Sequence, residues 1–75
     1  MTVMGAVAVI GEETRIRGFA MVGAILLAAE DAPAVRAAWR RLPPDVAVVI
    51  LTAAADDVLK DRDHASTWPL VTVMQ

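Results

Sequence analysis

The 75-residue sequence contains no cysteine and only one histidine. Disulfide bonds and thiolate metal sites are therefore excluded, and one histidine cannot form a conventional zinc site without several carboxylates beside it. A chain of this length buries a smaller fraction of its surface than a large one and is marginally stable by itself. Its stability must come from an unusually apolar core, from a partner, or from both.

An excess of positive charge is also missing, because seven Lys and Arg residues stand against nine Asp and Glu residues. The net charge of −2 gives no case for nucleic-acid binding. The longest uncharged stretch, residues 18–29, is too short to cross a bilayer as a helix. The N-terminus also lacks the positive charges of a signal peptide. We therefore expect a cytoplasmic protein.

Hydrophobic residues make up 57% of the chain, and many are alanine and valine, which suit close packing of helices on a sheet. Apolar runs predict strands at residues 3–10, 24–29, 46–51 and 70–74. Helices are predicted at 14–22, from 31 or 32 up to Pro43, and at 53–62. This βαβαβαβ order predicts one α/β domain: a four-stranded parallel sheet of order 2-1-3-4 with three helices, in a Rossmann-like three-layer arrangement. The first helix should cover one face and the other two helices the opposite face.

Local signals refine the first strand and helix. Gly11 supplies backbone freedom for a sharp exit from the sheet, and Thr14 is predicted to cap the helix. Gly18 has a packing explanation, namely a close approach of the helix to the sheet. Gly23 stands where a C-terminal glycine ends a helix. The inward side is expected to carry residues Ile16, Phe19, Ala20 and Gly23.

The second and third helices have clearer signals. Pro33 fits the first turn of a helix, where the missing amide proton costs nothing. Trp39 lies on the same face as Val35 and is expected to pack the helix onto the sheet. Thr52 directly follows the most apolar strand and can cap the third helix.

No catalytic constellation is recognised. The glycines at 11, 18 and 23 match neither a dinucleotide fingerprint nor a phosphate loop, and no lysine is present there. Glu12 and Glu13 occupy the turn and would repel a phosphate. His64 has no serine or cysteine partner at a recognisable spacing. The acidic residues Asp56, Asp57, Asp61 and Asp63 are explained more simply as a solvated surface than as a cation site. We expect no catalytic, cofactor-binding or metal-binding residues and no ATP binding.

Three separated pieces of the chain carry a resemblance to a known family. The first piece has Ile-Gly followed by an acidic residue, then Gly-Phe, and then a segment rich in small residues. The second piece is the most apolar strand with the threonine that directly follows it. The third piece is Pro-Leu-Val. The residues concerned are Ile10, Gly11, Glu12, Gly18, Phe19, Gly23, Thr52 and Pro69. In order and spacing, these pieces resemble the F subunit of the vacuolar/archaeal-type (V/A-type) rotary ATPases.

The resemblance implies a non-catalytic subunit of the central rotor stalk, which binds the coiled-coil D subunit and turns with it. ATP would be handled by other subunits, and the complex would transport protons or sodium. The subunit would need no cofactor and would be peripheral to the membrane through the complex, without inserting into it. Members of the family usually continue past the last strand, so residues 1–75 are expected to form the F-subunit-like domain without that C-terminal extension.

The contact surface for such a partner is predicted at the carboxyl end of the sheet together with the helix face around Arg36 and Arg40. One alternative is a free-standing regulatory module shaped like a receiver domain. It would require a phosphorylatable aspartate after strand 46–51, where Thr52 stands instead. A second alternative, a small nucleotide- or ligand-binding domain, is disfavoured by the missing phosphate loop.

Overall fold

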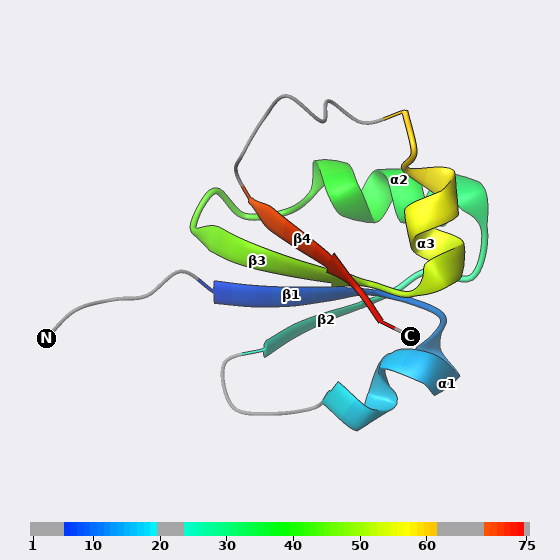
Figure 1. Cartoon of the computed structure of the whole chain (residues 1–75), viewed down its shortest axis with the longest axis horizontal. Coiled ribbons are helices and arrows are strands. Elements are labelled where there is room, and N and C mark those ends of the chain that lie inside the picture. The colour runs from blue at the N-terminus through cyan, green and yellow to red at the C-terminus, as the bar shows by residue number, and fades with distance from the viewer. Residues whose placement is uncertain (1–5, 20–23, 62–68, 75) are drawn as a thin grey trace, which may run out of the picture.

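The computed structural model describes residues 6–19, 24–61 and 69–74. They form a four-stranded sheet of order β2-β1-β3-β4, and every neighbouring pair is parallel (Figure 1). The strands are β1 (Ala6–Gly11), β2 (Ala24–Ala28), β3 (Val46–Leu51) and β4 (Leu70–Val73). The predicted fold class, strand order and parallel pairing are thus confirmed. The predicted strand residues 3–5 lie outside the described residues.

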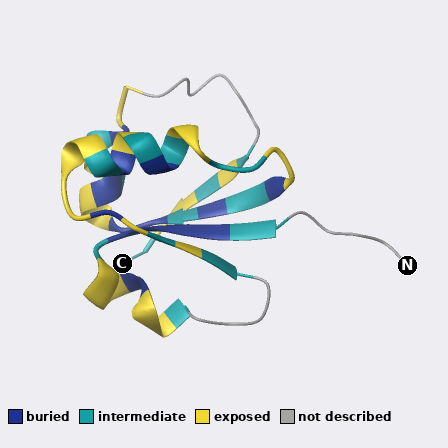
Figure 2. Cartoon of the chain, turned by 180° about the vertical axis from the view of Figure 1, so that it is seen from behind, coloured by how far each residue is buried: buried dark blue, intermediate teal, exposed yellow. Residues whose placement is uncertain are grey.

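The helices form a layer on each face of the sheet. α1 (Glu13–Ile16) packs against β1 and β2, whereas α2 (Ala32–Arg40) and α3 (Ala53–Val58) cover the opposite face, as predicted (Figure 1). Buried residues concentrate in the two central strands and on the inner sides of α2 and α3 (Figure 2). The main core cluster is Ala8, Ile10, Ala29, Val35, Ala38, Val46, Val49, Leu51, Ala55 and Leu59.

Helix α2 forms where the sequence predicts it and for the expected reasons. Asp31 is the N-cap, and its carboxylate accepts a hydrogen bond of 2.9 Å from the Ala34 N–H. Pro33 lies in the first turn. Trp39 is half-buried and packs against the core cluster, which confirms that it holds α2 on the sheet.

The first helix is shorter than predicted, and its cap is different. It covers Glu13–Ile16 and continues as a 3-10 turn, η1 (Arg17–Phe19), while residues 20–23 lie outside the described residues. Glu12, not Thr14, is the N-cap residue, and Thr14 is an exposed residue inside the helix. The side-chain acceptor comes from elsewhere: Glu30, which follows β2, accepts the Glu13 N–H at 2.9 Å. The prediction failed because this acceptor is distant in sequence.

The explanations given for two glycines are also wrong. Gly18 is exposed, and a Cβ there would meet no atom within 4 Å, so no close packing requires it. Gly11 is the last residue of β1, and its φ lies outside the left-handed region, so a turn does not require it either. A Cβ on Gly11 would collide with the side chain of Thr52. Glycine is needed there because the ends of β1 and β3 approach closely.

Helix α3 ends at Val58, earlier than the predicted boundary at residue 62. Its N-cap is Thr52, as predicted, and the Thr52 hydroxyl accepts the Ala55 N–H at 3.2 Å. The Leu59 N–H closes the helix by donating to the Ala55 and Asp56 carbonyls, both at 3.1 Å. The segment to Asp61 is a turn, and residue 62 lies outside the described residues.

Strand β4 forms one edge of the sheet. Its Leu70 is 59% exposed, the largest exposure among the large hydrophobic residues that the structure describes. Leu70 pairs with Val48 of β3, whereas α1 lies on β1 and β2. Part of the apolar surface of the β3–β4 pair is therefore not covered by α1. No helix in the described parts of the chain is long and apolar enough to cross a membrane.

Candidate functional site

Two of the three motif pieces meet at the carboxyl edge of the sheet. The parallel neighbours β1 and β3 end side by side, which places Gly11 next to Thr52. A Cβ built on Gly11 would lie 2.7 Å from Thr52 Oγ1 and 2.9 Å from Thr52 Cβ, and closer still to the methyl carbon. Thr52 has no exposed surface. The glycine and the threonine therefore occupy one tightly filled space.

Thr52 also joins the two motif pieces through hydrogen bonds. Its hydroxyl donates to Glu12 Oε1 at 2.8 Å and at the same time accepts the Ala55 N–H. The Thr52 N–H donates to the Ile10 carbonyl at 3.1 Å. A threonine at this position thus pairs with β1, caps α3 and holds the Glu12 side chain. No buried side-chain N or O atom in the described residues lacks a hydrogen-bond partner.

The Glu12 carboxylate is stabilised in its ionised form. A hydrogen bond from backbone N–H, together with the Thr52 hydroxyl and the nearby charge of Arg15, lowers the pKa of Glu12 below its ordinary value of 4.5, although partial burial opposes this effect. A carboxylate that is ionised and already hydrogen-bonded is poorly suited to accept a proton at neutral pH. The Glu12–Thr52 pair links the end of β1 to the start of α3.

The position of Thr52 disfavours the alternative of a regulatory module shaped like a receiver domain. The position after β3 that would carry a phosphorylatable aspartate holds Thr52, which is fully buried and whose hydroxyl is engaged in two hydrogen bonds. Within the described residues, no group of three His, Cys, Asp or Glu side chains is arranged to hold a metal ion.

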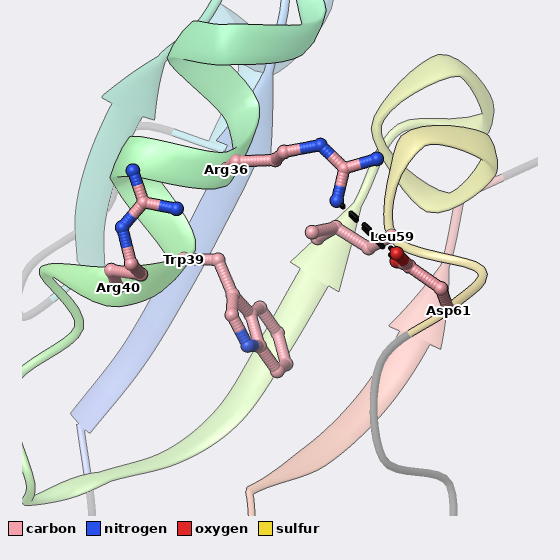
Figure 3. A pocket seen from close by; sticks show the side chains of 5 residues that line it. All are labelled: Arg36, Trp39, Arg40, Leu59 and Asp61. Atoms are coloured by element: carbon pink, nitrogen blue, oxygen red, sulfur yellow. Dashed lines mark hydrogen bonds and ion pairs between the residues drawn. The ribbon is translucent and has the colours of Figure 1, made fainter.

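A second region, on the opposite side of the sheet from α1, is a groove between α2 and α3. It has a volume of about 180 Å³ and is lined by Arg36, Trp39, Arg40, Leu59 and Asp61 (Figure 3). Small-molecule and cofactor sites usually have volumes of about 300–1,000 Å³. This groove is smaller than that, and its size fits a side chain better than a cofactor.

Of the two arginines that line the groove, one has an acidic partner among the described residues and the other does not. Arg36 reaches across from α2 to Asp61, and its guanidinium nitrogen lies 3.4 and 3.5 Å from the two carboxylate oxygens (Figure 3). Both side chains are substantially exposed, at 46% and 72%, so the pair is weak and exchangeable. Arg40, one helical turn further on, has no ion pair with any residue that the structure describes.

The structure brings Arg36 and Arg40 to one groove but separates them from the motif residues. α2 begins beside the carboxyl edge and runs back along the sheet toward the start of β3, so its last residue, Arg40, lies away from that edge. Pro69 directly precedes β4, whose first residue, Leu70, pairs with Val48 of β3. Phe19 is half-buried at the end of η1. Gly23, Asp63 and His64 lie outside the described residues.

Leu59 and Asp61 are groove residues that the sequence analysis did not identify as such. Leu59 is an apolar residue within the third helix predicted at 53–62, and that apolar character was a usable signal. Asp61 had no such signal, because a polar residue in a turn gives no sign of a partner on another helix.

A comparison of the chain with protein-family models, with curated proteins and with solved structures gives no match.

Proposed function

We propose that this protein is a non-catalytic subunit of the central rotor stalk of a V/A-type ATPase or ATP synthase, equivalent to the F subunit. In this role it binds the coiled-coil D subunit in a one-to-one complex and turns with it. ATP turnover takes place on other subunits and is coupled through the stalk to proton or sodium transport. The protein is peripheral to the membrane through that complex.

The observation that carries the proposal is the contact between motif residues 40 positions apart. Ile10, Gly11 and Glu12 belong to one piece of the family resemblance and Thr52 to another. The lack of space for a Cβ on Gly11 and the hydrogen bond between Thr52 and Glu12 give each residue a reason for its identity. The residues of the two pieces thus form one interlocked unit in the fold. The contact therefore supports the resemblance.

Two further features agree with a binding role. Glu12, the acid nearest to the strand ends, is committed to Thr52, and the groove between α2 and α3 is small for a nucleotide. The edge strand β4 and its exposed Leu70 also leave apolar surface available to a partner. These features favour a protein surface over an active site.

Co-expression with the coiled-coil D subunit of the same organism's rotary ATPase, followed by size-exclusion chromatography, tests the proposal. We expect the two proteins to co-elute at micromolar concentration as a one-to-one complex, whose mass can be measured by light scattering. An unrelated coiled coil of similar length is the matched control and should elute separately. If the D subunit also elutes apart from this protein, the rotor-stalk function is wrong.

A further inference from the structure

Arginines give the exposed side of α2 a positive charge. Between residues 32 and 42 the chain has three arginines and no acidic residue, although its net charge is −2. The carboxyl edge of the sheet carries Glu12, Glu13, Glu30 and, at the N-cap of α2, Asp31. An acidic partner is therefore repelled by one edge of the sheet and attracted to the arginines of α2.

The groove beside these arginines combines three kinds of contact. Arg36 and Arg40 supply guanidinium groups that match the geometry of a carboxylate. Trp39 offers an indole ring that is only half-buried, and Leu59 forms the apolar floor (Figure 3). Arginine and tryptophan are the residue types most enriched among the side chains that dominate binding energy at interfaces.

Asp61 already occupies part of this groove. Its carboxylate faces Arg36 at 3.4 Å, which is longer than the 2.7–2.9 Å typical of a strong charged hydrogen bond. A chain end or side chain that carries a carboxylate can displace such an exposed contact at little cost. Arg40 needs no displacement, because no ion pair with a described residue holds it.

From this arrangement we infer that the groove between α2 and α3 binds an acidic side chain presented by a helix of the partner, with Arg36 and Arg40 as the receptor and Asp61 as an internal competitor. The inference rests on the proposed function, because the helix that presents the acid is one of the two helices of the coiled-coil subunit. A helical partner fits the groove, since successive acids at i and i+4 lie on one face, as Arg36 and Arg40 do on α2.

Three variants test this inference against the coiled-coil D subunit by isothermal titration calorimetry. Arg36→Glu with Arg40→Glu should weaken binding by about 30-fold or more, as expected for the loss of a hot spot. Asp61→Asn should tighten binding by about threefold, because it removes both the competitor of Arg36 and a repulsive charge. Arg15→Glu with Arg17→Glu makes the same change of charge on the α1 side of the sheet and should leave the affinity within twofold.

The opposite effects of the two groove changes distinguish a carboxylate receptor from a general weakening of the fold. Far-UV circular dichroism and a thermal melt of each variant verify folding. If the double groove variant changes affinity no more than the Arg15 and Arg17 control, or if Asp61→Asn weakens binding, the inference is wrong although the proposed complex stands.

If the wild-type protein does not bind the D subunit, the proposed function fails and the groove is tested separately. The probe is then a synthetic helical peptide with glutamates at i and i+4, added to ¹⁵N-labelled protein. A saturable shift of the Trp39 indole N–H signal, assigned with Trp39→Phe and absent from the Arg36 and Arg40 double variant, would support the carboxylate receptor. No shift at millimolar peptide would overturn it.

Discussion

Replacing Gly11 by alanine should destabilise the protein strongly, although alanine is normally the better residue for an ordered chain. The added Cβ would meet the Thr52 methyl carbon, Thr52 Oγ1 at 2.7 Å and Thr52 Cβ at 2.9 Å. Rotation of the threonine side chain can move its methyl and hydroxyl groups but not its Cβ. The ends of β1 and β3 would therefore have to separate, in a part of the molecule where Thr52 is completely buried.

The magnitude can be estimated from three contributions. Overpacking a well-filled site costs about 1–3 kcal/mol. Displacing Thr52 also weakens the N-cap of α3, which adds about 1 kcal/mol. The reduced freedom of the unfolded chain restores about 0.4–1 kcal/mol. We expect a net loss of about 2–3 kcal/mol, which is a large fraction of the roughly 4–11 kcal/mol that a 75-residue domain has.

Urea unfolding monitored by far-UV circular dichroism measures this loss as a shift of the midpoint at constant slope. Gly18→Ala is the matched control, because a Cβ at this exposed position meets nothing within 4 Å. It should be neutral or stabilising by up to about 1 kcal/mol. If Gly11→Ala were as stable as the Gly18 variant, the close approach of β1 and β3 would not exist as described.

A double-mutant cycle with Thr52→Ser identifies the cause. Serine keeps the hydroxyl that caps α3 and holds Glu12, but it removes the methyl carbon nearest to the added Cβ. The double variant should be more stable than the sum of the two single changes by about 1 kcal/mol, as expected for residues in direct contact. Simple additivity would show that Gly11→Ala acts through some other contact.

Three further predictions follow from the site and its helices. Because the pKa of Glu12 is lowered in the folded protein, its ionised form stabilises the fold above the unfolded pKa, and this stabilisation is lost as pH falls through the lowered value. Urea titrations should therefore show wild type about 1 kcal/mol more stable than Glu12→Gln at pH 7 and no more stable in strong acid; a difference independent of pH would contradict this. Asp31→Ala, which removes the acceptor of the Ala34 N–H, should cost about 1 kcal/mol, whereas Asp45→Ala in an exposed turn should be neutral by the same assay. Calorimetric titration with Mg-ATP should give no saturable heat, and a micromolar dissociation constant would refute the prediction that this chain does not bind ATP.

The sequence by itself determined the elements whose signals are local. Strand β3 covers residues 46–51 as predicted, because a continuous run of apolar and mostly β-branched residues has few alternatives in a chain with this alternation. The start of α2 follows from an aspartate N-cap and a proline in the first turn, which act within three residues of each other. The alternation of strands and helices indicates a parallel sheet with right-handed crossovers, and the order 2-1-3-4 places the two most apolar strands in its middle.

The tertiary structure decided whatever depends on residues far apart in the chain. Glu30 caps α1 from 17 positions away, Asp61 contacts Arg36 from 25 positions away, and Thr52 binds Glu12 from 40 positions away. None of these pairs has a local signature, since the acceptor and the donor belong to different elements. The prediction for Thr14 failed because a helix accepts a cap from any nearby carboxylate, and only folding shows which one is near.

The role of Gly11 shows this division most clearly. From the sequence, a glycine at the end of a strand indicates backbone freedom in a turn, because glycine tolerates conformations that other residues avoid. In the folded protein, Gly11 has a φ outside the left-handed region and is required by the side chain of Thr52, which directly follows the neighbouring strand. The sequence shows that residue 11 is glycine, but not why glycine is required there. The reason appears only when β1 and β3 lie side by side, because their pairing leaves no room for a Cβ at this position.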